Sequence, residues 1–138
     1  MIILDTNVVS ALMTDEPDAT VARWLDRQPR ESIWTTTVTI FELRVGIELL
    51  PVSRKRQRIE EQFSRFVHED IQDRVLTLDA RAAHEAAILS ARRRLRGMPI
   101  ETRDTMIAGI VISRRAEFAT RNVRHFADLD AVIDPWNT

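Results

Sequence analysis

The chain has 138 residues, of which 44% are hydrophobic and 30% charged, with only 3 Gly and 5 Pro residues. This composition is typical of one folded domain over residues 1–138, and it excludes the disordered, collagen-like and repeat classes. Twenty basic residues against 21 acidic ones give a net charge of -1, so overall charge favours neither a nucleic acid nor an anionic membrane as partner. A nucleic acid would have to be bound by local basic patches.

The chain contains no cysteine, which excludes disulfides, thiolate zinc sites and cysteine nucleophiles. This suits a reducing compartment such as the cytoplasm. The apolar start Met1–Leu4 is interrupted by Asp5 and has no basic segment before it, so it does not resemble a signal peptide. No apolar run approaches the length of a membrane span. We therefore expect a cytoplasmic protein without a membrane partner.

Short apolar runs alternate with longer helical patterns along the chain, which is typical of β-α units around a parallel sheet. Strands that are covered on both faces are short and apolar throughout. The predicted strands are Ile2–Asp5, Ile33–Thr35, Val75–Leu78, Glu117–Thr120 and Ala131–Asp134. The fold class is therefore predicted to be α/β.

Helical spacing of apolar residues predicts five helices between these strands. They are Ala19–Arg27, Val38–Leu50, Ser53–Val67, the segment from Asp79 to Arg96, and Arg103–Arg115. The second of these is apolar on nearly every side, which predicts a buried helix. Asp79 and Thr102 are the expected N-caps of the last two helices.

Asp5 ends the first predicted strand, and ligands of open α/β sheets gather at the carboxyl ends of strands. The alternative is that Asp5 only caps the next turn or helix, because Asp is a favoured N-cap.

Glu42 lies among apolar residues of the predicted buried helix. A buried carboxylate must be paired, protonated or bound to a cation. Arg44 is too close in sequence to share its helix face, whereas Glu48 is expected to be exposed.

Asp104 opens the last predicted helix, where a carboxylate also interacts favourably with the helix dipole. The small residues Ala108 and Gly109 would let this helix lie close against the sheet, bringing Asp104 near the end of the first strand.

Only the fold could bring Asp5, Glu42 and Asp104 together, because they are far apart in the sequence. Three carboxylates without His or Cys would form an all-oxygen site, which prefers Mg²⁺ or Mn²⁺ over zinc. The cation would also relieve the repulsion between the three charges.

Five segments, in order, resemble the PIN-domain nucleases, and within them the VapC-type toxins of toxin-antitoxin pairs, including the FitB-like branch. These segments are Ile3–Asn7, Thr39–Gly46, Arg103–Ala108, Thr120–Phe126 and Val132–Trp136. The resemblance spans nearly the whole chain. It implies a PIN-like three-layer fold, in which a short central parallel sheet has helices on both faces.

The resemblance implies that Asp5, Glu42 and Asp104 hold Mg²⁺, with Mn²⁺ as a substitute, and that Glu42 binds directly or through water. Many relatives carry a fourth acid where this chain has Asn122, which can offer only a carbonyl oxygen to the metal or its water. A one-metal mechanism becomes more plausible as a result. Thr6 resembles the hydroxyl that supports the first carboxylate; alternatively, it is a turn residue.

The function implied is a Mg²⁺-dependent endoribonuclease, in which a metal-activated water attacks the phosphodiester in line. The implied partners are an RNA substrate, a cognate VapB-type antitoxin in a heteromeric complex, and a second copy in a homodimer. Two alternatives stay open. One is a catalytically silent binding or regulatory module with the same fold, suggested by Asn122, and the other is a nuclease acting on DNA.

Two basic clusters could contact RNA phosphates. The first is Arg54, Arg56 and Arg58, and the second is Arg92, Arg93, Arg94 and Arg96. The alternative for both is a solvated helix face, which we favour for the second cluster because it ends a helix. The role of His125 is open.

Overall fold

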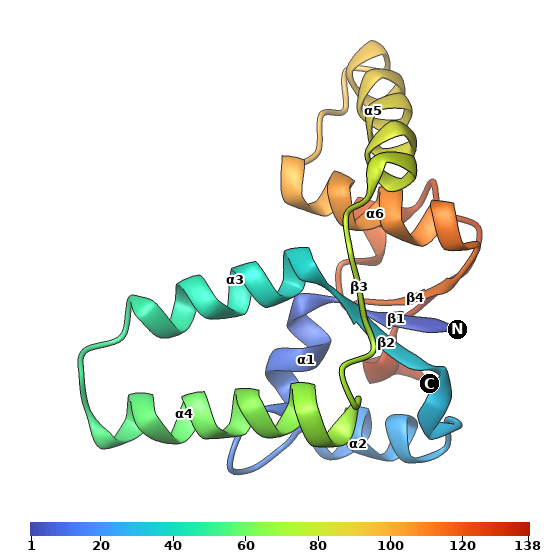
Figure 1. Cartoon of the computed structure of the whole chain (residues 1–138). Coiled ribbons are helices and arrows are strands. Elements are labelled where there is room, and N and C mark those ends of the chain that lie inside the picture. Colours follow the sequence, from blue (N-terminus) through green and yellow to red (C-terminus); the bar gives the residue numbers. More distant parts are fainter.

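The computed structural model describes residues 1–138 as an α/β domain with a five-stranded sheet between layers of helices (Figure 1). The strand order is β3-β2-β1-β4-β5 and every pairing is parallel. The strands are β1 (Ile2–Leu4), β2 (Ile33–Thr36), β3 (Val75–Leu76), β4 (Glu117–Ala119) and β5 (Val132–Ile133). All five lie where the sequence predicts them, with small shifts at their ends, and the predicted fold class is confirmed.

Six α-helices and four short helical turns connect the strands. The α-helices are α1 (Thr6–Leu12), α2 (Ala19–Asp26), α3 (Thr37–Glu48), α4 (Arg54–Arg65), α5 (Ala80–Leu95) and α6 (Thr102–Arg114). The turns are η1 (Arg30–Ser32), the π-helical η2 (Phe66–Asp70), η3 (Val123–Phe126) and η4 (Pro135–Asn137). None of the helices combines the length and apolar character that crossing a bilayer requires.

Helix ends follow the local capping chemistry. Asp79 accepts a hydrogen bond from the Ala82 backbone N–H and caps α5, as predicted. Glu101, and not Thr102, caps α6, because its carboxylate accepts from the backbone N–H groups of the first turn. Helix α1 was not predicted; Asp5 is its N-cap.

The core has two halves, one on each face of the sheet. Ile3 of β1 packs in the half formed with α5 and α6, whereas its neighbour Leu4 packs with α1 and α2 on the other face. Adjacent strand residues point to opposite faces, so one short strand serves both halves. Trp24 is buried, and Trp34 and Trp136 pack against the core. Helices on both faces are thereby confirmed.

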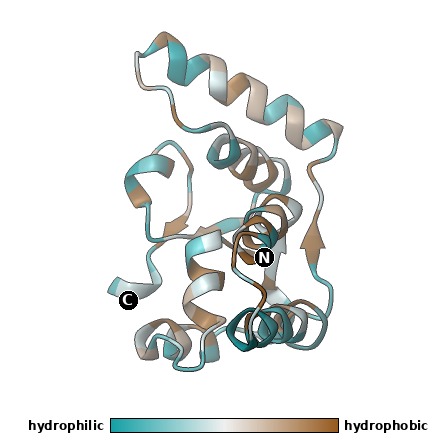
Figure 2. Cartoon of the chain, turned by 90° about the vertical axis from the view of Figure 1, so that its left-hand side faces the viewer, coloured by the Kyte–Doolittle hydropathy of each residue, from teal (hydrophilic) through white to brown (hydrophobic).

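Helix α3 departs from its prediction. Only Val38, Thr39 and Ile47 are buried, while Phe41 is 56% and Leu49 80% exposed. The predicted burial of the whole segment is wrong, because α3 leaves the sheet at the end of β2 and projects with α4 as a hairpin (Figures 1 and 2). We call α3 and α4 the projecting hairpin.

Ion pairs join the two helices of the projecting hairpin. Glu48 contacts both Arg44 and Arg56, and Glu60 contacts the same two arginines. These side chains are partly or largely exposed, and exposed pairs of this kind contribute roughly 0–1 kcal/mol each. Glu48 is exposed, as predicted.

Arg93 does not belong to an exposed basic face. Its side chain is 4% exposed, and its guanidinium binds both carboxylate oxygens of Asp128 at 2.9 and 2.8 Å. It also donates to the Thr105 hydroxyl at 3.0 Å and to the His125 carbonyl at 3.1 Å. A solvated role is therefore wrong for Arg93, which ties α5 to α6 and η3, whereas Arg92, Arg94 and Arg96 are exposed.

Gly109 sits where α6 crosses α5. A Cβ at this position would lie 2.4 Å from the Ala82 carbonyl oxygen and 2.8 Å from the Ala86 nitrogen. The close approach that Gly109 permits is therefore to α5 and not to the sheet, while Ala108 packs in the core beside the strands.

Replacing Gly109 by Ala is expected to lower the free energy of unfolding by about 2 kcal/mol, because backbone atoms of α5 must move. Gly46→Ala is the matched control: it lies in α3 with nothing near its missing Cβ, and should stabilise by up to about 1 kcal/mol. Urea denaturation of both variants measures the difference. Equal effects at the two glycines would contradict the packing argument.

Replacing Asp128 by Ala is expected to cost about 3 kcal/mol of stability, because it leaves the buried Arg93 charge without its partner. The control is Asp130→Ala, two residues away, which is exposed and forms no ion pair. Thermal unfolding of the two variants should separate them by several degrees; coinciding melting curves would exclude this role of Asp128.

Candidate functional site

The three predicted acids lie at the carboxyl end of the sheet. Asp5 directly follows β1, Glu42 is in the second turn of α3, which continues from β2, and Asp104 is in the first turn of α6. Thr120 directly follows β4, the other neighbour of β1. Figure 2 views the protein from the side on which α3 projects. The neighbouring parallel strands β1, β2 and β4 thus place polar groups at the carboxyl end of the sheet, where sheets of this kind bind ligands.

Asp5 is 3% exposed, and the fold holds both of its carboxylate oxygens. Oδ1 accepts from the Thr6 backbone N–H at 2.8 Å, and Oδ2 accepts from the Thr120 hydroxyl at 2.7 Å and more distantly from Asn7 at 3.4 Å. Burial raises the pKa of Asp5 to about 6, against the opposing effect of these hydrogen bonds. Asp5 therefore both caps α1 and presents a poorly solvated carboxyl group.

Thr120 was not identified from the sequence as a site residue. It is fully buried, donates to Asp5, and accepts from the Asn122 backbone N–H at 3.0 Å. Its position at the end of a predicted strand, within the family-like segment Thr120–Phe126, was the available signal.

Glu42 is not enclosed by apolar residues; its side chain is 21% exposed. The Thr6 hydroxyl donates to Oε1 at 2.9 Å, and Arg103 lies 3.9 Å from Oε2. Thr6 therefore supports Glu42 through its hydroxyl, and supports Asp5 only through its backbone N–H. This differs from the expectation that the hydroxyl supports the first carboxylate.

Asp104 is half-buried, and its Oδ2 lies 3.5 Å from Nδ1 of His125. Burial, followed by the negative charge of Glu101, raises the pKa of Asp104, while His125 opposes the shift. The sequence left the role of His125 open; the structure places it beside Asp104, with its own side chain largely exposed.

The carboxylates of Asp5, Glu42 and Asp104 influence one another electrostatically, although their oxygens are not gathered around one point. The charges of Asp104 and Glu42 both contribute to the raised pKa of Asp5. As the side chains stand, no three His, Asp or Glu residues are grouped so that they could hold a metal ion. Glu42 is directed to Thr6 and Arg103, and Asp104 to His125. Asn122 is exposed and reaches the cluster only through its backbone bond to Thr120.

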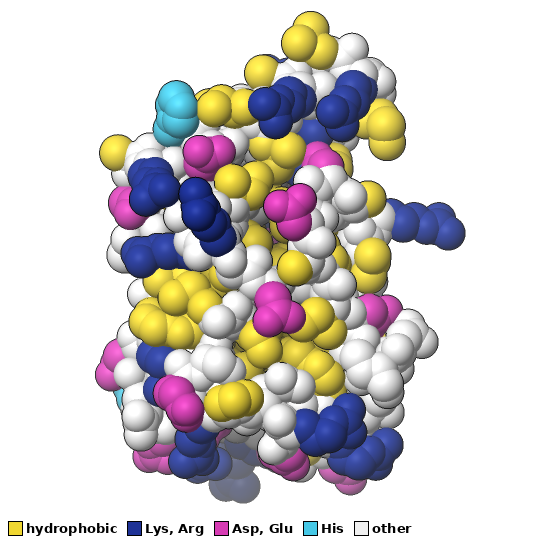
Figure 3. Space-filling view, turned by 90° about the vertical axis from the view of Figure 1, so that its right-hand side faces the viewer, with side chains coloured by type: hydrophobic (Ala, Val, Ile, Leu, Met, Phe, Trp, Pro, Cys, Tyr) yellow, Lys and Arg dark blue, Asp and Glu magenta, His cyan; other side chains and the backbone are white.

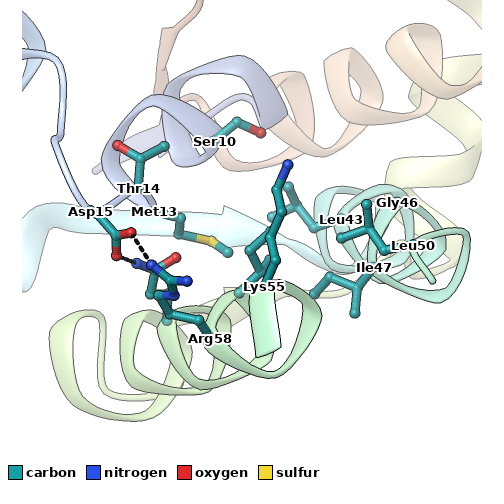
Figure 4. A pocket seen from close by; sticks show the side chains of 12 residues that line it. Ser10, Met13, Thr14, Asp15, Leu43, Gly46, Ile47, Leu50, Lys55 and Arg58 are labelled. Atoms are coloured by element: carbon teal, nitrogen blue, oxygen red, sulfur yellow. Dashed lines mark hydrogen bonds and ion pairs between the residues drawn. The ribbon is translucent and has the colours of Figure 1, made fainter. Parts of the chain in front are cut away.

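A groove of about 530 Å³ lies between α1, α3 and α4 (Figure 4). Leu43, the neighbour of Glu42, lines it together with Ile47 and Ile59, while Lys55 and Arg58 supply its basic side chains. We call it the hairpin groove. It is mostly apolar, and it adjoins Glu42 because both lie along α3.

The arginines predicted to contact RNA lie on α4. Arg56 is engaged by Glu48 and Glu60, and Arg58 pairs with Asp15 at 2.9 Å, while Arg54 is exposed and forms no ion pair. The side of the protein opposite the projecting hairpin carries acidic, basic and hydrophobic side chains interspersed (Figure 3).

Comparison with known proteins places the chain in a family. A PIN-domain model matches residues 2–132. The chain is 38% identical to plasmid stability protein StbB of Pseudomonas syringae pv. tomato over 99% of both chains. It is 35% identical to VapC ribonuclease Y4jK of Sinorhizobium fredii over 99% of this chain and 98% of that protein.

Toxin FitB of Neisseria gonorrhoeae is 30% identical over 99% of both chains. The crystal structure of FitAcB from the same organism superposes with a TM-score of 0.84 at 29% identity and covers 100% of both chains. The fold and these relatives agree with one another. The chain belongs to the PIN-domain family, in the branch that contains the VapC and FitB toxins.

Proposed function

We propose that the chain is a Mg²⁺-dependent endoribonuclease and the toxin of a toxin-antitoxin pair. The observation that carries the proposal is the buried Asp5 carboxyl group, whose pKa is raised by burial and by the charges of Asp104 and Glu42. A site with this excess of negative charge is suited to a cation. Relatives named as a VapC ribonuclease and a toxin support the choice of reaction and role.

The donor set fits a hard divalent cation. All candidate ligands are oxygens, which suit Mg²⁺ or Mn²⁺ rather than zinc. Asp5 and Asp104 are the main proposed ligands, with Glu42 binding directly or through water and Asn122 contributing its carbonyl oxygen through water. Glu42 and Asp104 are partly exposed and their ionic partners are 3.9 and 3.5 Å away, so Oε2 of Glu42 and the Asp104 carboxylate can turn toward a shared ion while Oε1 of Glu42 keeps its bond to Thr6.

Residues of the chain prepare the site for hydrolysis. Thr120 and the Thr6 N–H fix the orientation of Asp5, and the Thr6 hydroxyl fixes Oε1 of Glu42, leaving Oε2 to orient a water. A divalent ion bound by the carboxylates would supply Lewis-acid activation of that water and stabilise the charge that develops on the phosphodiester. Arg103 lies 3.9 Å from Glu42, and a substrate phosphate could replace the Glu42 carboxylate as the partner of its guanidinium group.

The antitoxin is proposed to cover the hairpin groove and the carboxylates. Exposed apolar residues Phe41, Val45 and Leu49 of α3 lie on the projecting hairpin, next to the groove. A partner segment that buries such residues would also block the site, since Glu42 is on the same helix. A homodimer remains a further proposal.

A catalytically silent binding module is the second candidate function. It is favoured by Asn122 in place of an acid and by carboxylates that are not grouped around one point. Titration calorimetry with Mg²⁺ and Mn²⁺ separates the candidates: binding of neither ion by the folded protein would support the silent module. A panel of RNA and DNA substrates decides between the two types of nuclease.

Replacing Asp5 by Asn is expected to lower RNA cleavage by at least about 100-fold, because it removes a proposed metal ligand. Thermal unfolding of the same variant should show a fold at least as stable as the parent, since a costly buried charge is gone. The control is Asp130→Asn, an exposed carboxylate on the same chain. Cleavage by Asp5→Asn at the parental rate would refute the proposed site.

The pKa of Asp5 also predicts how stability changes with pH in the metal-free protein. Because the folded-state pKa is about 6 and the ordinary value is 3.8, the folded protein binds more protons than the unfolded chain between these values. The free energy of unfolding therefore rises as the pH falls through this window, by up to about 3 kcal/mol from this group.

Asp128 has the opposite effect on the free energy of unfolding at lower pH. Its pKa is lowered by the hydrogen bond to Arg93, so the stability that its ionised form contributes is lost as the pH falls. The quantity to measure is therefore the difference between the parent and Asp5→Asn, by urea denaturation from pH 7 to pH 4 with a chelator present. Saturating Mg²⁺ should shrink that difference at pH 7. A difference independent of pH would show that Asp5 does not titrate in this range.

A further inference from the structure

A second groove, of about 240 Å³, lies between the end of α5, the loop that leads to α6, and η3. Its lining includes Arg96, Met98 and Ile100 from the first two segments, and Arg124 and His125 from η3. We call it the arginine groove. It is separate from the hairpin groove, with which it shares no residue.

The arginine groove adjoins Asp104 through His125. His125 lines it and at the same time lies 3.5 Å from Asp104. The ion pair between the buried Arg93 and Asp128 forms part of its wall. Arg93 also binds the His125 carbonyl and the side chain of Thr105, the neighbour of Asp104. The geometry of the groove relative to Asp104 is therefore fixed by a network of hydrogen bonds.

The charge in this groove is available to a ligand. Arg96 and Arg124 are exposed and neither forms an ion pair. Asp128 is the one carboxylate in the lining, and Arg93 binds both of its oxygens. On α4, by contrast, Arg56 and Arg58 are already paired with carboxylates, and of the three arginines predicted there to contact RNA only Arg54 is unpaired.

We propose that the arginine groove binds the backbone of single-stranded RNA leading to the carboxylates, an inference that rests on the proposed function. Arg96 and Arg124 contact phosphates, for which the guanidinium group is suited by its paired donors. Met98, which is 66% exposed, offers an apolar surface to an unstacked nucleotide beside them. The RNA path thus runs over the α5–α6 loop and η3, and not over α4.

RNA binding and RNA cleavage are tested separately, so that the two proposals can fail independently. Binding is measured by fluorescence anisotropy of a labelled single-stranded RNA, with every variant made in the Asp5→Asn background to prevent cleavage. The salt concentration is varied, because each phosphate contact contributes roughly 0.7 to the slope of log Kd against log salt for single strands. Cleavage of the same RNA is measured with Asp5 intact.

Arg96→Ala combined with Arg124→Ala is expected to raise Kd about tenfold and to reduce the salt slope by about 1.4. The control has the same loss of charge: Arg23→Ala combined with Arg114→Ala, on exposed arginines of α2 and α6 that form no ion pair. It should change Kd by less than about twofold. Arg96→Lys combined with Arg124→Lys keeps the charge and should restore the slope even if the alanine variant is less stable.

Equal Kd values and slopes for the groove and control variants would overturn the proposal. So would a larger loss for Arg54→Ala than for the groove variant, since the path would then run over α4. If the groove variant loses binding while the parent cleaves no RNA, the groove is supported and the nuclease function is refuted. If the parent cleaves RNA and the groove variant binds normally, only the groove is refuted.

Discussion

Burial of the Asp5 carboxyl group at the end of β1 is the constraint on which the site depends. The carboxyl is held by a backbone N–H of α1 and by the Thr120 hydroxyl after β4, so three elements must be in place to position it. Its raised pKa shows that this arrangement opposes folding when the group is ionised. A fold that tolerates such a cost retains a negative charge at a place where a cation can bind it.

Local patterns in the sequence were sufficient for the strands and for most helices, because short apolar runs and helical periodicity are set by neighbouring residues. They were insufficient for α3, whose apolar residues were interpreted as buried. Phe41 and Leu49 face solvent because no other element of this chain covers them, and periodicity carries no information on where a covering element lies. Helix α1 was missed for a different reason: it begins at Thr6, directly after Asp5, which was interpreted as the end of a strand.

The acids of the site could be proposed from the sequence because carboxylates in apolar surroundings are conspicuous. Most of the contacts that support them could not. The hydroxyl that binds Asp5 comes from Thr120, at the far end of the chain, and the hydroxyl of Thr6 turns out to serve Glu42. Arg93 was grouped with its exposed neighbours because its partner, Asp128, is 35 residues away. Contacts between side chains from distant segments leave no local pattern.

The projecting hairpin contributes few residues to either half of the core. Its helices are held to each other by exposed ion pairs around Glu48, which salt screens. The hairpin can therefore open locally at a lower free energy than the sheet, and its amide hydrogens should exchange with solvent through this partial opening. Glu42 lies on α3, whereas Asp5 lies at the end of β1. Opening of the hairpin would therefore move Glu42 relative to Asp5.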